Sequence, residues 1–386
     1  MNRTIIWAIV ARFAVVALFF DGIGPLFPNI AHAFSLTDYA FQQIIGVSFI
    51  VFAIFQLLSV YVIASLGLYR CILWSTSLLV LTVILLSVVR QPYFFAIVFI
   101  AMFAVNSIGS NATRIALRNF TSANEFKRYF AWAQMIIQGK QIIMPVIASL
   151  IATVYGWHYA LLALGLPIVL VSIWLGSVDR KYVAEPSGQQ LIAPLKDIRA
   201  LLQTRFFVIP ISLLISFHAV FAYTTTWFAF VLSHYFDFSI TSIGWLLSLA
   251  SAVMALGFGF AGWLSQYWSN NELLKLSIGL MLLAVSSLLF FTEIYMWVIG
   301  VLSLELAYAF VVLPCTAWVM DMHLDYRVSA SAVLGFIAPI AGGLAVLLMG
   351  IAEINPLIGI PNALGVAIVL MAFLFSNLNV KNAESA

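Results

Sequence analysis

Long apolar stretches recur along almost the whole chain, and short polar segments separate them. A transmembrane helix needs roughly 20 mostly apolar residues. Stretches of that kind lie near residues 5–28, 39–63, 71–89, 93–117, 129–154, 158–178, 206–233, 240–266, 273–292, 295–320, 329–352 and 358–378. The pattern therefore predicts an all-α protein with twelve membrane-spanning helices.

One longer hydrophilic segment, 179–205, divides these stretches into two sets of six. Its central Pro-Ser-Gly is typical of a linker, and its later part, "LKDIRALL", indicates a short helix on the membrane surface. We expect a six-helix bundle over 1–178, a cytoplasmic linker over 179–205 and a second six-helix bundle over 206–386. Two such repeats around a central pathway are typical of secondary transporters. Hydropathy alone leaves other twelve-span folds open, including a membrane-embedded enzyme.

The composition supports a membrane location. Of the 386 residues, 64% are hydrophobic and 8% are charged, whereas a soluble domain carries about 25% charged residues. Cys71 and Cys315 are too few and too far apart for a disulfide framework or a metal site, and nothing predicts a cofactor. Arg3 precedes an apolar run without a small-residue cleavage pattern, so we expect the first helix to stay as an anchor.

The positions of lysine and arginine predict the orientation, because cytoplasmic loops are enriched in them. With the N-terminus inside, the cytoplasmic side holds Arg3, Arg70, Arg118, Lys127, Arg128, Arg180, Lys181, Lys196, Arg199, Arg205, Lys275, Arg327 and Lys381. The opposite loops hold Arg90 alone. We therefore expect both termini in the cytoplasm, and three basic residues inside the membrane: Arg12, Arg114 and Lys140.

A polar stretch, "NSIGSNATRIALR" at 106–118, interrupts one of the most apolar regions. At 3.6 residues per turn, one helix face carries Ser107, Ser110, Asn111, Arg114 and Arg118. Lipid cannot satisfy such a face, so we expect it to point into the bundle or into a water-filled cavity. Arg114, with Asn111 nearby, either lines a substrate pathway or holds helices together through carbonyl groups or an acidic neighbour.

The first apolar stretch contains two charged residues. Asp21 lies beyond its middle, where an ionised carboxyl is costly, so the group is suited to take up and release a proton. The alternative is a satisfied carboxyl that holds helices together. Arg12 lies nine residues earlier, half a revolution away at about 100° per residue, and we expect its side chain to extend toward the cytoplasmic surface.

The fifth stretch, near 129–154, contains Lys140 close to its middle. Gln134, Gln138 and Gln141 form a polar stripe on the same predicted helix, at spacings of i, i+4 and i+7. Lys140 is turned about 100° from Gln141, and it is either the partner of a buried carboxyl or a residue that contacts substrate. Lys140, Gln138 and Gln141 are therefore candidate pathway residues.

The second half places a single acidic residue, Glu305, near the middle of a span, with Tyr308 one turn further on. Glu305 is the second candidate for proton coupling, after Asp21. His218 titrates in a useful range, but an isolated histidine is more often a structural residue. Tyr223 is a candidate pathway residue, whereas the threonines after it are expected to bond to their own helix backbone.

Six short strings follow one another along the chain: "DGIGPLFPNIAHAF", "FAIFQL", "EFKRYF", "GWHYALL", "FAYTTTWF" and "VSASAVLGF". In the first, Asp21, Pro25 and Pro28 occupy the fixed positions of a known pattern. In their order and spacing, the strings resemble the Bcr/CflA branch of drug:proton antiporters in the major facilitator superfamily. The resemblance extends over most of the chain.

The chain departs from that branch at several positions. The loop after the second span, "VIASLGLYRC", keeps Gly67 but has Ala64 where an aspartate is expected, and it lacks the usual basic residues. An arginine expected early in the fourth span is also missing. In the fifth span Ala148 and Ser149 replace glycines, and their small size preserves close helix packing.

The resemblance implies a monomeric inner-membrane transporter, with no bound nucleic acid, that exports small amphipathic compounds in exchange for protons. Asp21 would be the first proton carrier and Glu305 the second. Because Arg114 and Lys140 add cationic groups, an anionic or zwitterionic substrate stays open as the alternative: an amino acid, a carboxylate or an iron chelator, carried outward or inward. No nucleophile–base pair or phosphate-binding loop favours an enzyme.

Overall fold

The computed structural model describes residues 3–119, 142–177, 203–290, 293–320 and 327–382. Within these ranges every regular element is a helix. Ten of the described helices are long and apolar enough to cross a membrane, and two shorter apolar helices lie at Ile6–Val16 and Ile142–Tyr155. Each of them overlaps one of the twelve predicted stretches, and the part of the fifth stretch at 129–141 lies outside the described residues. The all-α membrane architecture predicted from hydropathy is therefore confirmed.

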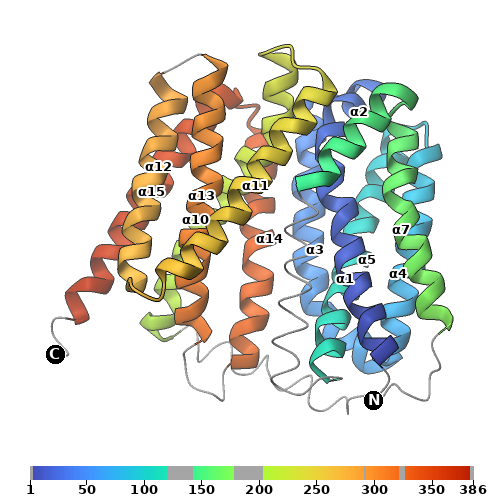
Figure 1. Cartoon of the computed structure of the whole chain (residues 1–386), viewed down its shortest axis with the longest axis horizontal. Helices are drawn as coiled ribbons and strands as arrows, with labels where there is room; N and C mark the ends of the chain where they lie inside the picture. Colours follow the sequence, from blue (N-terminus) through green and yellow to red (C-terminus); the bar gives the residue numbers. More distant parts are fainter. Residues whose placement is uncertain (1–2, 120–141, 178–202, 291–292, 321–326, 383–386) are drawn as a thin grey trace. The chain divides into compact units, whose positions relative to one another are not determined.

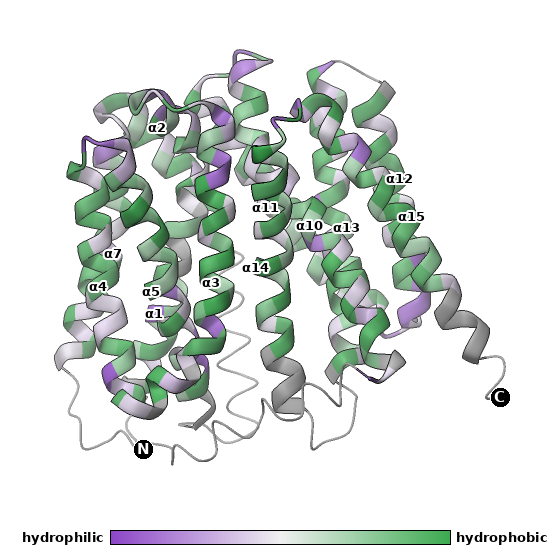
Figure 2. Cartoon of the chain, turned by 180° about the vertical axis from the view of Figure 1, so that it is seen from behind, coloured by the Kyte–Doolittle hydropathy of each residue, from purple (hydrophilic) through white to green (hydrophobic). Residues whose placement is uncertain are grey.

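The chain forms two compact units. Unit 1 comprises Met1–Ile192 with Asp237–Ser248, and unit 2 comprises Ala193–Phe236 with Leu249–Ala386. Within each unit the long helices run side by side (Figure 1). Hydrophobic residues cover most of their length, and hydrophilic residues gather near their ends and in the loops (Figure 2). Bundle boundaries at 178 and 206 stay a prediction.

Unit 1 consists of α1 (Arg3–Gly22), the 3-10 helix η1 (Gly24–Leu26), α2 (Phe27–Ala33), α3 (Asp38–Leu66), α4 (Leu68–Val88), α5 (Pro92–Asn119), the helix Ile142–Tyr155, α7 (Trp157–Ser177) and the first part of α11 (Ile240–Leu264). Helix α5 packs against α3, α4 and α1, and α7 packs against α4 and α1. The polar stretch of α5 therefore lies among three other helices.

The first span is shorter than its hydropathy predicts. Helix α1 ends at Gly22, and the chain continues as η1 and α2. Pro25 lies in the first turn of η1 and Pro28 in the first turn of α2. A proline lacks a backbone N–H and is favoured in the first turn of a helix, where that N–H would have no partner within the helix. The prediction of one helix over 5–28 is therefore wrong.

The loop predicted at 64–70 is also shorter in the structure. Helix α3 extends to Leu66 and α4 begins at Leu68, so Gly67 alone joins them. Gly67 has φ of 83°, a left-handed conformation that side-chain-bearing residues adopt only with strain, and its N–H donates to the Ile63 carbonyl. The glycine that this loop keeps is therefore the residue that the turn requires.

Close packing at Ser149, expected from its small size, is confirmed within unit 1. A Cβ added to Gly244 of α11 would overlap the Ser149 hydroxyl and lie 2.8 Å from the Pro145 carbonyl oxygen. Nearby, the hydroxyls of Thr153 and Thr241 are 3.0 Å apart. The two helices thus meet backbone to backbone, as small residues allow in membranes.

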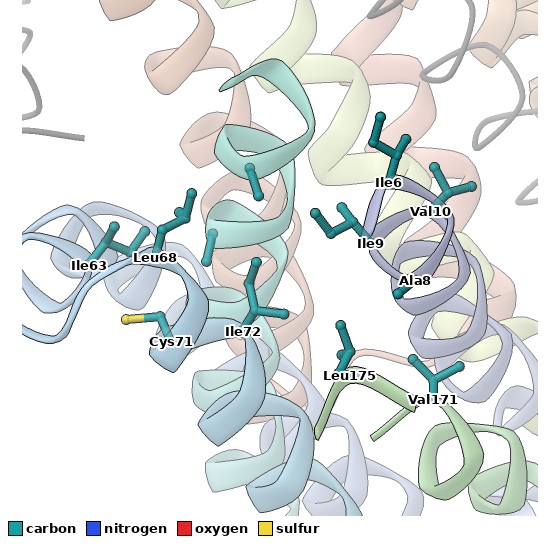
Figure 3. Close-up of a cluster of buried hydrophobic side chains, with 12 residues drawn as sticks. Ile6, Ala8, Ile9, Val10, Ile63, Leu68, Cys71, Ile72, Val171 and Leu175 are labelled. Atoms are coloured by element: carbon teal, nitrogen blue, oxygen red, sulfur yellow. The ribbon is translucent and has the colours of Figure 1, made fainter. Parts of the chain in front are cut away.

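Two groups of apolar side chains pack along the described part of α1. The aliphatic cluster consists of Ile6, Ala8, Ile9, Val10, Ile63, Leu68, Cys71, Ile72, Ala112, Ala116, Val171 and Leu175, and side chains of α1, α4 and α7 meet in it (Figure 3). Further along, Phe95, Phe99 and Phe103 of α5 form an aromatic ladder with successive ring centroids 5.6 and 5.3 Å apart, and Phe20 of α1 lies 4.9 Å from Phe103. Residues between these two groups lie in an apolar environment.

Unit 2 consists of α10 (Arg205–His234), the later part of α11, α12 (Asn270–Phe290), α13 (Ile294–Met320), α14 (Arg327–Ile351) and α15 (Pro356–Asn382). Helix α10 packs against α13, α14 and α15, and α12 packs against α13 and α15. Gly300 of α13 lies where α12 approaches most closely: an added Cβ would be 2.7 Å from Leu288 Cγ and 3.2 Å from the Ala284 carbonyl oxygen.

We expect Gly300→Ala to destabilise the protein by about 1–3 kcal/mol, because the added methyl group must push α12 and α13 apart. Gly279→Ala in α12 is the matched control, since no atom lies within 4 Å of the position of its Cβ. The control should stay within about 1 kcal/mol of the parent. Unfolding midpoints in detergent compare the two variants, and equal midpoints would contradict the close α12–α13 contact.

Candidate functional site

The polar stretch of α5 presents different faces to different helices. Two of its side chains bond to α3: the Ser107 hydroxyl donates to the Phe52 carbonyl at 2.7 Å, and Asn111 Nδ2 donates to Ser59 Oγ at 2.6 Å. Ser59 in turn donates to the carbonyl of Gln56 in its own helix. The predicted pathway residue Asn111 is therefore also a link between α5 and α3.

Arg12 of α1 donates to three side chains of neighbouring helices, and it is 0% exposed. Its Nε donates to Thr76 Oγ1 at 2.8 Å, its Nη1 to Thr113 Oγ1 at 2.6 Å and its Nη2 to Ser75 Oγ at 3.4 Å. Ser75 and Thr76 belong to α4, and Thr113 belongs to α5. The expectation that Arg12 extends to the cytoplasmic surface is wrong, because acceptors on two neighbouring helices hold it inside the unit.

The acceptors around Arg12 are neutral. Ser75 and Thr76 each donate to the Ile72 carbonyl, and Thr113 donates to the Gly109 carbonyl. Each hydroxyl therefore donates to its own helix while it accepts from the guanidinium. No carboxyl group contacts Arg12 within the described part of the chain. We call Arg12, Ser75, Thr76 and Thr113 the hydroxyl network.

Gly109 provides the space that the guanidinium occupies. A Cβ added at this position would overlap Arg12 Nη2 and Ser75 Oγ. Gly109 and Thr113 are four residues apart, so they lie on the same face of α5. Sequence reasoning missed this face, because it grouped the polar side chains of 106–118 into one stripe; the signal was the Gly-x-x-x-Thr spacing beside a buried arginine.

A third face of α5 carries Asn106, Ser110 and Arg114. The Ser110 hydroxyl donates to Asn106 Oδ1 at 3.0 Å, and both Ser110 and Arg114 are partly exposed. The Nε of Arg114 is buried and has no acceptor among the residues that the structure describes. The Nε–H group of Arg114 is thus a hydrogen-bond donor to which no described neighbour provides an acceptor.

Several predicted site residues cannot be placed. Lys140, Gln138 and Gln141 lie outside the described residues. The backbone of Asp21 belongs to the last turn of α1, and its side chain lies outside the described part.

Glu305 of α13 is buried in unit 2, with 6% of its side chain exposed. Its neighbour one turn on, Tyr308, is the centre of an aromatic group: its ring lies 4.4 Å from Phe221, 5.8 Å from Phe217, 5.9 Å from Phe258 and 5.5 Å from His218. Lys275 is the only lysine or arginine between residues 206 and 326, and it is the sixth residue of α12. Glu305 is therefore a buried carboxyl beside aromatic rings, far in sequence from any basic residue of a span.

Tyr223 is 1% exposed and faces α15, where an added Cβ at Gly359 would lie 2.6 Å from its hydroxyl oxygen. The structure thus places Tyr223 in the packing between α10 and α15. Thr225 donates to the Phe221 carbonyl and Thr226 to the Ala222 carbonyl. The expectation that these threonines bond to their own backbone is confirmed for Thr225 and Thr226, whereas the buried Thr224 hydroxyl has no hydrogen-bond partner among the described residues.

The comparisons identify the class of protein. The sequence profile of the Major Facilitator Superfamily matches residues 11–348. The chain belongs to the major facilitator superfamily, and it is a membrane transporter of small molecules. No curated protein sequence matches the chain significantly.

Solved transporters share the fold at low sequence identity. The POT family transporter PepTSo is 11% identical with a TM-score of 0.79, and the match covers 98% of each chain. A peptide transporter POT in complex with sulfate is 10% identical with a TM-score of 0.76, over 96% of this chain and 93% of that one. A bacterial homolog of the human lysosomal transporter Spinster, in an inward-facing and occupied conformation, is 12% identical with a TM-score of 0.71, over 96% and 95%.

We expect Arg12→Lys to be more destabilising than Arg12→Met. One ammonium nitrogen cannot reach the acceptors on α4 and α5 that three guanidinium nitrogens reach separately, and each lost hydrogen bond to a buried charge costs about 1.5–3 kcal/mol. Methionine leaves no charge behind, and the three hydroxyls keep their own backbone acceptors, so its cost should be about 1 kcal/mol or less. Unfolding midpoints in detergent measure the order, and a lysine variant as stable as the parent would contradict the network.

Proposed function

We propose that this protein is a proton-coupled secondary transporter that exports small amphipathic compounds by alternating access. The observation that carries the proposal is the buried carboxyl of Glu305 in a major facilitator, beside an aromatic group and without a lysine or arginine in the same span. A buried carboxyl without a permanent counter-charge is favoured in its protonated form, and it loses the proton when water or a cation reaches it.

Asp21 is the other proposed proton carrier. It occupies the acidic position of the string "DGIGPLFPNIAHAF", which resembles the Bcr/CflA branch of antiporters. Its backbone lies one residue before the end of α1, where the regular helix gives way to η1. A carboxyl at a helix break in a transporter is well placed to exchange protons, because broken helices line substrate and ion sites in such proteins.

The aromatic group around Tyr308 supports an amphipathic substrate. Phe221, Phe258 and Tyr308 are partly exposed, whereas Phe217 is buried beneath them. Rings of this kind bind apolar bodies and, through their faces, cationic groups. A compound with an apolar body and a protonatable amine would therefore fit beside Glu305.

The proposed location is the inner membrane, with both termini in the cytoplasm. The excess of lysine and arginine in one set of loops supports that orientation. The protein is proposed to act as a monomer with substrate, protons and lipid as its partners.

We expect Asp21→Asn to abolish uphill, proton-driven transport while the protein stays folded in the membrane, because asparagine keeps the size of aspartate but cannot carry the proton. Asp38→Asn is the matched control, since Asp38 lies in the first turn of α3 at the end of a span. A substrate screen in proteoliposomes with an imposed pH gradient supplies the assay. If Asp21→Asn still concentrates substrate, coupling does not depend on Asp21, and Glu305→Gln is the next variant to measure.

A second candidate function is transport of an anionic or zwitterionic metabolite, outward or inward. The buried, unused Nε of Arg114 favours it, because a cationic group in a low-dielectric site needs an anionic partner. One of the solved proteins with this fold is named a peptide transporter, in complex with sulfate. Lys140 is proposed as a second cationic contact, and Gln138 and Gln141 are proposed pathway residues.

We expect Arg114→Gln to weaken binding of anionic or zwitterionic substrates about ten- to a hundredfold more than binding of cationic ones, as the loss of a charge-assisted hydrogen bond predicts. Arg70→Gln is the matched control, because Arg70 is exposed in the first turn of α4. Equal losses for substrates of both charges would contradict the second candidate. A shifted pH dependence of transport would show instead that Arg114 pairs with Asp21 or Glu305.

A further inference from the structure

We infer that Arg12 is a positioning residue for Arg114: the hydroxyl network fixes the rotation of α5 and so turns the face of Asn106, Ser110 and Arg114 toward the substrate pathway. That this face meets a substrate pathway rests on the proposed transport function. That Arg12 fixes the rotation of α5 rests on the contacts of α5.

Helix α5 is held on two sides. On one side the guanidinium of Arg12 donates to Thr113 and occupies the space above Gly109. On the other side Ser107 bonds to the Phe52 carbonyl and Asn111 to Ser59, both in α3. Two attachments on different faces prevent rotation of a helix about its axis, which one attachment would permit.

The third face lies between these two attachments. Ser110 is one residue after Gly109 and one before Asn111, so it is turned about 100° from each. Arg114 follows Ser110 by four residues and therefore lies on the same face. The rotation that Arg12 and α3 impose thus decides where Arg114 points, although neither attachment touches it.

The Arg12 attachment has the larger energetic consequence. The guanidinium donor is charged and buried, and a hydrogen bond to a charged group is about twice as strong as one between neutral groups. The loss of any one acceptor is therefore costly. Arg12 is fully buried, in an apolar environment between the aliphatic cluster and the aromatic ladder, where an unsatisfied polar group is costly.

Chemical modification at Ser110 tests the inference without a transport substrate. Ser110→Cys is made in a background in which Cys71 and Cys315 are alanine, and the purified protein is treated with two methanethiosulfonates of similar size, one with a sulfonate and one with a trimethylammonium group. Arg114 should make the cysteine react about tenfold faster with the anionic reagent, the factor that 1.4 kcal/mol of charge interaction produces. Ile108→Cys, turned about 200° from Ser110, should react with neither.

Thr113→Val is the decisive variant, because it removes an acceptor of Arg12 and changes no charge. It should lower the ratio of anionic to cationic reaction rates toward the value of Arg114→Gln, and in the Arg114→Gln background it should have no further effect. Thr113→Ser keeps the hydroxyl and should restore the ratio. Thr82→Val is the matched control, since Thr82 of α4 donates to its own helix and does not contact Arg12.

The inference is overturned if Thr113→Val leaves the ratio as high as Thr82→Val does, which would make the network purely structural. It is also overturned if Ser110→Cys reacts no faster than Ile108→Cys, which would show that this face does not meet water. If Thr113→Val does not fold, Thr76→Val removes the acceptor of Arg12 Nε and gives the same comparison. Failed transport with the expected ratio would reject the proposed function and leave the role of Arg12 intact.

Discussion

A permanently charged guanidinium inside an apolar helix bundle must find all of its acceptors within the protein, and this requirement organises unit 1. Arg12 lies between an aliphatic and an aromatic core, and neutral hydroxyls on α4 and α5 accept its donors. Isolated hydroxyls are weak substitutes for a carboxylate. Here each one also donates to a backbone carbonyl, which polarises it and strengthens its acceptor oxygen. Three helices are thereby joined by one side chain, at a site where α5 must carry glycine.

Unit 2 handles its buried charge differently. Glu305 is buried one turn from Tyr308 and its aromatic neighbours, and α13 itself contains no lysine or arginine. A carboxyl can be neutralised by a proton, whereas a guanidinium cannot. Unit 1 therefore contains a buried cation that stays charged and holds helices in place, whereas unit 2 contains a buried acid that a proton can neutralise.

The departures from the Bcr/CflA pattern have a structural context. Gly67, the residue of the second loop that the chain retains, is the one whose positive φ lets α3 and α4 follow each other directly. Ser149, which replaces a glycine, still permits contact with Gly244. The arginine missing early in the fourth span contrasts with Arg12, which reaches that same helix from α1. Backbone geometry is thus retained where charged residues have changed.

The sequence by itself determined the membrane class, the places of the twelve helices and the presence of ionisable groups inside the spans, because hydrophobic length and charge are properties of each segment alone. It also marked Asp21, Glu305 and Arg114. Only the tertiary structure decided what the polar groups do. Periodicity predicted that Ser107, Asn111 and Arg114 share one face of α5. In the structure Ser107 and Asn111 bond to α3, whereas Arg114 lies on the neighbouring face with Asn106 and Ser110. Periodicity could not show that Arg12 turns inward, since the acceptors on α4 and α5 are 63 to 101 residues away along the chain. A side chain's partners depend on which helices lie beside it, and no local pattern contains that information.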